Sequence, residues 1–320
     1  LAATIVLAHA HRLEGDLVEA ERLLRQALDE PGTAAPEAWR LRADAELALA
    51  DVYIDVRKGQ EAVPLAADAV ALKRARLGPT HPEVLAALAT HGLALDAQLK
   101  FEEALTVATE LLTLHEQIYG AVHPRTASAH TTLAIAHDRL GHVAEAHQYS
   151  VRAYEIFRDT LGPTHVSTLN SLRNVAIGTS RLEGPARAVP LYRAVLEGRR
   201  QAFGPGHFST IESALGLAGV LARADARSSM AREAALDLLR LCDGLLVERS
   251  DPRGLDLCAT YLLEDAPPDL RNPARALELA RRAVEVEGRT QDRRLQTLAR
   301  AQHALGDREA AIRTMQEAFA

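Results

Sequence analysis

Cysteine is scarce in this chain. Only 2 of the 320 residues are cysteine, Cys242 and Cys258. Two are too few for the disulfide framework that holds a small secreted domain together, and so low a content is typical of proteins from a reducing compartment. We therefore expect both cysteines to pack as small apolar side chains in a cytoplasmic protein. A reactive thiol is the other reading.

Positive charge and long apolar runs are also missing. The net charge is −6, so no overall positive field would attract nucleic acid or an anionic membrane. No apolar stretch is long enough to cross a bilayer, and nothing resembles a secretory signal. Aromatic residues make up only 4% of the chain, which favours helices packed through small side chains over a sheet core. We expect an all-α cytoplasmic protein without nucleic-acid or membrane partners.

A six-residue motif recurs in the first two thirds of the chain with a period of 42 residues. Each copy is preceded in its own repeat by an alanine at a fixed position. The motifs are Leu77–Pro82, Tyr119–Pro124, Leu161–Val166 and Phe203–Phe208, and the alanines are Ala62, Ala104, Ala146 and Ala188. A fixed period of this size indicates a solenoid, in which each unit buries its apolar face only against its neighbours.

Each repeat is predicted to contain two helices. In the copy that starts at Pro124, apolar residues at helical spacing continue to Gly141, which should end the first helix. A second helix then runs to Phe157, and Gly162 is the glycine expected just past a helix end. Proline is tolerated in a first helical turn. The histidine of each motif is predicted to cap the helix that follows: His81, His123, His165 and His207.

A helix, a turn with glycine, x-x-Glu-Ala and a second helix resemble the tetratricopeptide repeat. The 42-residue length and the Leu-Gly-Pro-x-His-Pro connector resemble the kinesin-light-chain type, which is abundant in bacterial multidomain proteins. The resemblance is strong from Arg40 to Phe208, and Ser209 to Asp265 departs from the pattern. It implies an all-α, right-handed superhelical solenoid of antiparallel helix pairs over residues 1–320. The expected repeats are 1–30, 38–76, 82–118, 124–160, 166–202, 208–249 and 252–287 (both degenerate), and 290–320.

Two further features of the repeats stand out. Leu99 occupies the place of the glycine between the two helices, and in a later copy this glycine moves one place to Gly184. We expect Leu99 to strain its turn or to shorten the first helix. Apolar residues begin and end the chain without a polar capping helix, which repeat arrays normally need for solubility. We therefore expect self-association, or contacts with other parts of a longer parent protein, through Leu1, Ile5, Leu7, Ile312, Met315 and Phe319.

The 13 histidines could suggest metal or catalytic chemistry. The four connector histidines should lie one repeat apart, on the order of 10 Å, too far to share an ion with ligands at about 2 Å. The spacing of five between His137, His142 and His147 does not place them on one helical face. No zinc motif, phosphate-binding loop or nucleophile elbow occurs. We expect no metal, no cofactor and no catalytic residue.

The resemblance also implies which residues of the first helices face a binding groove. Acidic positions come first along the chain and basic positions follow, with an apolar row among them. The candidate peptide-binding residues are Asp51, Asp55, Asp96, Arg139, Asn170, Arg173, Asn174, Arg181 and Arg223, and the apolar row is Ile54, Leu93, Ile135 and Ile177. Arginine suits such a site because its planar guanidinium holds a carboxylate with two hydrogen bonds.

We predict a protein-interaction scaffold whose groove binds an extended peptide. The acidic or carboxylate end of the peptide would lie over the arginines and a basic end over the aspartates. The other reading is a solvated charged face whose residues pair internally. Two alternatives concern a longer parent protein. The chain could be the substrate-recruiting or sensory C-terminal arm of a bacterial signalling enzyme such as a serine/threonine kinase, or a ligand sensor joined to a DNA-binding domain.

Overall fold

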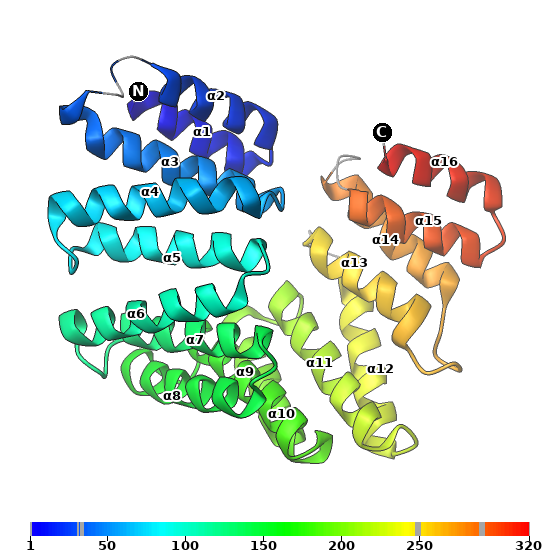
Figure 1. Cartoon of the computed structure of the whole chain (residues 1–320). Coiled ribbons are helices and arrows are strands. Elements are labelled where there is room, and N and C mark those ends of the chain that lie inside the picture. The colour runs from blue at the N-terminus through cyan, green and yellow to red at the C-terminus, as the bar shows by residue number, and fades with distance from the viewer. Residues whose placement is uncertain (1, 31, 33–34, 247–250, 288–291, 320) are drawn as a thin grey trace. The chain divides into compact units, whose positions relative to one another are not determined.

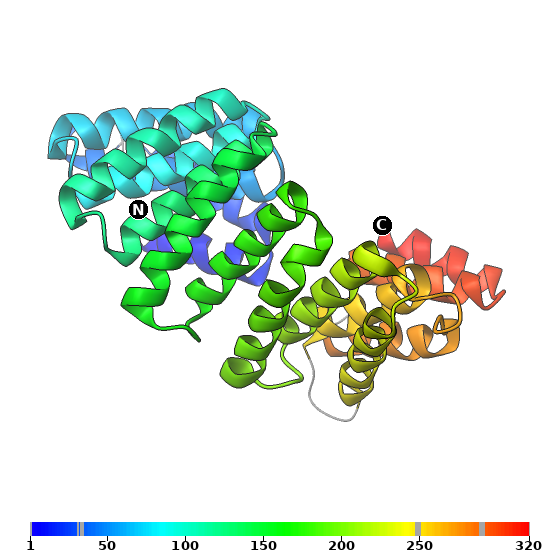
Figure 2. The same cartoon turned by 90° about the horizontal axis from the view of Figure 1, so that it is seen from below.

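The computed structural model describes residues 2–30, 32, 35–246, 251–287 and 292–319. The chain divides into two compact units, Leu1–Thr160 and Leu161–Ala320. In each unit, consecutive helices pack against one another in antiparallel fashion, as Figures 1 and 2 show. The described residues contain helices and no strand, so the prediction of an all-α helix-pair solenoid is confirmed.

The N-terminal unit contains four helix pairs. Its elements are α1 (Ala2–Glu14), α2 (Leu17–Asp29), a short 3₁₀-helix η2 (Pro36–Ala38), α3 (Trp39–Asp55), α4 (Gly59–Leu77), α5 (Pro82–Ala97), α6 (Phe101–Tyr119), α7 (Pro124–Arg139) and α8 (Val143–Leu161), whose last residue falls in the next unit.

The C-terminal unit also contains four pairs. Its elements are α9 (Val166–Leu182), α10 (Pro185–Phe203), α11 (Phe208–Asp225), α12 (Ser229–Gly244), α13 (Pro252–Thr260), which continues into a π-helix η3 (Tyr261–Asp265), α14 (Pro273–Glu287), α15 (Asp292–Ala304) and α16 (Arg308–Ala318).

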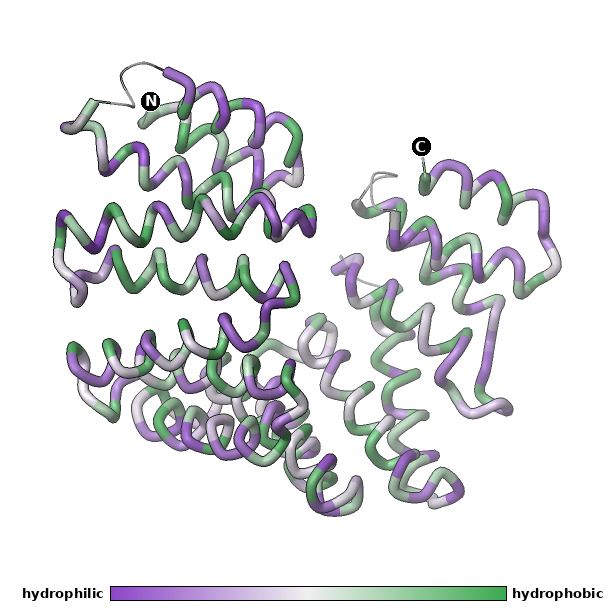
Figure 3. Tube along the Cα trace, in the orientation of Figure 1, coloured by the Kyte–Doolittle hydropathy of each residue, from purple (hydrophilic) through white to green (hydrophobic). Residues whose placement is uncertain are grey.

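Small side chains bring the helices of each unit close together. The repeat alanines are buried, Ala62 and Ala188 completely, as expected for positions where one helix crosses another. Apolar and polar residues alternate along each helix (Figure 3). One face of each helix can therefore join the core while the other meets water.

The connector between repeats ends one helix and starts the next. Gly162 follows α8 at φ +90°, a left-handed conformation that glycine adopts without a steric penalty. Nδ1 of His165 then accepts a hydrogen bond from the backbone N–H of Ser167 at 3.1 Å. His81, His123 and His207 cap their helices in the same way. The predicted capping role of these histidines is confirmed.

The turn inside the second 42-residue copy is strained. Leu99 lies at φ +62°, in the left-handed region, where its counterpart Gly141 lies at φ +77°. A side chain with a Cβ atom pays about 1–2 kcal/mol in that conformation. The strain expected at Leu99 is confirmed. The first helix is not shortened, since α5 and α7 are both 16 residues long.

Replacing Leu99 with glycine should therefore stabilise the N-terminal unit. The Leu99 side chain is 70% exposed, so its removal loses little burial, and we expect a gain of about 1 kcal/mol after the larger backbone entropy of glycine is counted. Urea unfolding followed by the fluorescence of Trp39, the single tryptophan, measures it. The matched variant Gly141→Leu should shift the midpoint in the opposite direction; equal midpoints for all three proteins would contradict the strain argument.

Cys242 and Cys258 form a disulfide, with Cα atoms 5.7 Å apart. The prediction that they pack as separate thiols is wrong. Cys242 lies near the end of α12 and Cys258 on α13, and both side chains are buried. Because the cysteines are paired, they no longer support a reducing environment, and the cytoplasmic location stays a prediction.

Of the apolar residues noted near the two ends of the chain, Leu1 lies outside the described residues and the others are partly or largely exposed. Leu7 on α1 is half exposed, and Ile312 on α16 and Phe319 just after it are more so. Self-association through them stays a prediction. Among the described helices, none combines the length and apolar character needed to cross a membrane.

Candidate binding groove

A large hollow of the C-terminal unit lies beside α11. Its volume is about 920 Å³, and its walls come from α9 to α13, η3 and the segment after η3. Small residues of α11 provide the room. A Cβ atom on Gly216 would lie 3.1 Å from the Tyr192 ring, and one on Gly219 would lie 3.4 Å from Nη1 of Arg223. The scarcity of side chains on this helix face explains why a pocket forms here.

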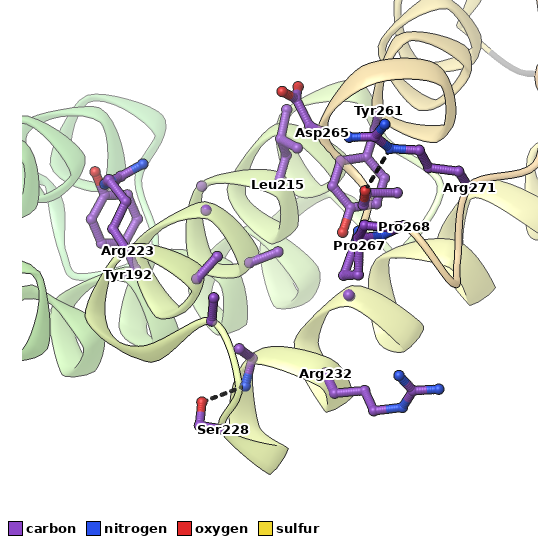
Figure 4. Close-up of a pocket in the computed structure, with 18 of the residues that line it drawn as sticks. Tyr192, Leu215, Arg223, Ser228, Arg232, Tyr261, Asp265, Pro267, Pro268 and Arg271 are labelled. Atoms are coloured by element: carbon purple, nitrogen blue, oxygen red, sulfur yellow. Dashed lines mark hydrogen bonds between the residues drawn. The ribbon is translucent and has the colours of Figure 1, made fainter.

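Two tyrosines form part of the pocket wall. Tyr192 from α10 and Tyr261 from η3 are both buried, and burial raises the pKa of each phenol. Arg173 and Arg223 act in the opposite direction on the pKa of Tyr192, so both guanidinium groups lie near that ring. Figure 4 shows Tyr192 beside Arg223 and Tyr261 near Arg271. The pocket thus combines aromatic surface with positive charge.

Five arginines line the pocket: Arg173, Arg223, Arg227, Arg232 and Arg271. Arg271 is held in place, since Nε donates to the carbonyl of Ala266 at 3.1 Å and Nη2 to that of Glu264 at 2.9 Å. Within the described part of the chain, Arg223, Arg227 and Arg271 make no ion pair with a carboxylate.

The carboxylates of the pocket are mostly engaged. Glu212 accepts from Arg199 at 2.8 Å and lies 3.6 Å from Arg173. Asp269 accepts from Arg232, and this hydrogen bond lowers the pKa of Asp269. Asp265 is the third carboxylate that lines the pocket. The three arginines without a carboxylate partner therefore leave the pocket with an excess of positive charge.

Of the sequence-predicted residues of α9, Asn170 belongs to a structural network and Arg173 lines the pocket. The side-chain carbonyl of Asn170 accepts from Nη2 of the buried Arg199 at 2.8 Å. Asn174 is half-buried and does not line the pocket. Arg181 lies in the last turn of α9, outside the pocket lining. Of the candidate residues, only Arg173 and Arg223 line the pocket.

The predicted acidic residues lie in the N-terminal unit and are paired there. Arg12 contacts Asp51 at 3.2 Å and Asp55 at 2.6 Å. Desolvation by burial raises the pKa of Asp51, and the charge of Arg12 opposes that rise. Arg139 contacts Asp96 at 3.1 Å. These pairs join first helices of different repeats.

Two residues of the predicted apolar row are exposed and the other two pack against a core. Leu93 is 56% and Ile135 49% exposed, and both line an apolar hollow of about 170 Å³ between α5, α6 and α7. Ile54 and Ile177 pack against the cores of their own units.

Sequence reasoning missed most of the basic pocket. Arg227 and Arg232 lie around the start of α12, Tyr261 is on η3, and Arg271 follows Pro267 and Pro268. All four belong to the stretch where the repeat pattern degenerates, so repeat positions could not place them. The signal available was the density of arginine and small residues between 216 and 232.

Comparison with known proteins identifies this architecture. Tetratricopeptide repeat models match residues 41–117, 98–159 and 168–209, about half of the chain. No curated protein matches it. One similar crystal structure is that of a Podosopora anserina putative kinesin light chain with nearly identical TPR-like repeats. Its sequence is 24% identical to this chain. The match covers 66% of this chain and 99% of that one, with a TM-score of 0.57.

Two Rap proteins share the fold along nearly the whole chain. Apo RapI is 12% identical, with 99% of this chain and 96% of that one covered and a TM-score of 0.61. A Rap protein complexed with competence and sporulation factor is 13% identical, with coverages of 98% and 75% and a TM-score of 0.55.

The helix pairs and the hollow that they form define a repeat solenoid, the class of fold that serves as a protein–protein interaction scaffold. The chain belongs to the tetratricopeptide repeat family, and its fold resembles that of the kinesin-light-chain-like repeats.

Proposed function

We propose that the C-terminal unit binds an acidic, extended segment of a partner protein in the pocket beside α11. The observation that carries the proposal is the set of Arg223, Arg227 and Arg271, which line one hollow and have no carboxylate partner among the described residues. A carboxylate of the partner would form charge-assisted hydrogen bonds there, which are about twice as strong as neutral ones.

The shape of the pocket favours a peptide segment over a single ion. A volume of about 920 Å³ lies near the upper end of ligand sites in proteins, which hold about 300–1,000 Å³. The rings of Tyr192 and Tyr261 offer apolar surface beside the arginines, so acidic residues that alternate with apolar ones would match it. The Rap protein complexed with competence and sporulation factor shows that a related fold can hold a ligand.

The proposal differs from the sequence prediction in one respect. The aspartates expected to hold a basic end of the peptide are bonded to Arg12 and Arg139 in the N-terminal unit. These pairs favour the other reading, internally paired charges, for Asp51, Asp55 and Asp96. We therefore confine the proposed site to the C-terminal unit.

Binding of a labelled peptide tests this proposal. The probe is a ten-residue peptide of alternating glutamate and leucine with a fluorescein label, and its lysine-for-glutamate counterpart is the comparison. We expect the acidic peptide alone to bind. Arg223→Glu with Arg227→Glu should weaken binding at least about tenfold, because a charge-assisted hydrogen bond contributes about 1.5–3 kcal/mol. Fluorescence anisotropy measures both affinities.

A charge-matched variant separates a local contact from overall attraction. Arg240 and Arg313 are exposed and lie outside the pocket, so Arg240→Glu with Arg313→Glu changes the net charge equally. It should bind the acidic peptide nearly as the parent protein does. Equal losses in the two double variants, or equal affinity for both peptides, would sink the proposal. The alternative that the chain is the recruiting arm of a larger signalling enzyme stays a prediction.

A further inference from the structure

The turn between α7 and α8 brings two imidazole rings together. His142 N–H donates to the carbonyl of His137 at 2.9 Å, and Gly141 N–H donates to that of Asp138 at 3.0 Å. These two bonds, with Gly141 at φ +77°, form a Schellman motif, in which the side chains that flank the helix end meet. A spacing of five separates two side chains on a straight helix, but in this turn it brings them into contact.

The separation of the two rings matches a metal chelate. The Nδ1 atoms of His137 and His142 lie 3.4 Å apart. Zinc–nitrogen bonds of about 2.0–2.1 Å at a tetrahedral angle place two ligand nitrogens about 3.3–3.4 Å apart. A square-planar ion such as Cu²⁺ would require about 2.9 Å. We propose that His137 and His142 chelate one Zn²⁺ ion through their Nδ1 atoms.

Neighbouring side chains prepare His137 for this role. The ring of Tyr149 stacks on His137 with centroids 5.3 Å apart and planes 13° apart, which fixes the imidazole orientation. Burial, followed by the charge of His142, lowers the pKa of His137. The carboxylate of Glu145 opposes that shift, so its charge acts close to the site.

The site has two protein ligands, and water completes the coordination. Among the residues that the structure describes, no three histidine, cysteine or acidic side chains converge on a metal position. One of the two rings carries its proton on Nδ1 in this hydrogen bond. On zinc binding that proton moves to Nε2 of the same ring, so both ligands are neutral imidazoles. The places of His137 and His142 are taken by other residue pairs in the earlier turns of the N-terminal unit. These pairs are His11 with Asp16, Tyr53 with Lys58 and Leu95 with Lys100.

Isothermal titration of the untagged full chain with ZnCl₂ tests the site. We expect one equivalent to bind with a measurable heat. His142→Asn and His137→Asn should each weaken binding at least about tenfold. Mg²⁺ should not bind, because it prefers oxygen ligands. The control His303→Asn, an exposed histidine on α15, should bind as the parent does.

A second readout follows the folded state. Zinc should raise the thermal midpoint of the Trp39 fluorescence transition in the parent protein and leave that of His142→Asn unchanged, because a ligand stabilises only the state that binds it. Zinc binding that survives both His137→Asn and His142→Asn would overturn the proposal. So would the absence of any zinc-dependent heat or midpoint shift in the parent, which would leave the two rings as a simple hydrogen-bonded pair.

Discussion

Loss of the Cys242–Cys258 disulfide should destabilise the C-terminal unit by about 3 kcal/mol. The two cysteines are 16 residues apart, and closing a loop of about 15 residues removes roughly this much free energy from the unfolded chain. The disulfide also joins α12 to α13, and both helices contribute residues to the pocket, Arg232 from the first and Leu257 from the second. Its loss should therefore loosen the pocket as well.

The single tryptophan makes this measurement specific to one unit. Trp39 lies in the N-terminal unit, so its fluorescence reports unfolding there, whereas far-ultraviolet circular dichroism reports all helices. In Cys242→Ser with Cys258→Ser, part of the dichroism transition should move to lower urea while the Trp39 transition stays in place. The parent protein refolded with a reductant should behave in the same way. Unchanged dichroism in both samples would show that the disulfide does not form or contributes nothing.

The architecture could be predicted because local signals agree within the repeats. The connectors supply a left-handed glycine, a histidine cap and, in two of them, a proline at the first position of the next helix. Each of these features depends on residues close together in the sequence. The second half of the chain shows the limit of such signals. Helices are present in the degenerate stretch, as α11, α12 and α13 with η3, but how they pack could not be read from a degenerate repeat.

The site was predicted less well because contacts between helices decide it. Repeat positions singled out Arg173 and Arg223, which line a hollow. They could not show that Glu212 pairs with Arg173 and that Asp96 pairs with Arg139. The disulfide was missed for a similar reason: composition describes the average compartment, whereas pairing depends on how two helices pack against each other. The contact between His137 and His142 likewise depends on the geometry of a single turn.

The substitution Arg199→Met should destabilise the C-terminal unit by about 3 kcal/mol. The Arg199 residue is 3% exposed, and its guanidinium donates to the carbonyl of Ser209, to Glu212 and to Ser213 at 2.8–2.9 Å. A further bond reaches Asn170 at 2.8 Å. The arginine thereby ties α10 to both α9 and α11. Removing one partner of a buried charged network leaves the others desolvated and unpaired, which costs about 3–5 kcal/mol.

An equivalent position in an earlier repeat shows which residue could replace Arg199. Lys73 occupies the same place three repeats earlier, is equally buried, and bonds Asp44 at 2.6 Å and Glu83 at 2.8 Å. Because a lysine can serve there, Arg199→Lys should recover part of the stability that Arg199→Met loses, whereas the less buried neighbour Arg200→Met should cost little. Circular dichroism during urea unfolding measures the three variants. If Arg199→Met and Arg200→Met unfold at the same urea concentration, the network around Arg199 does not stabilise the unit, and Asn170 would again be a candidate for binding a partner.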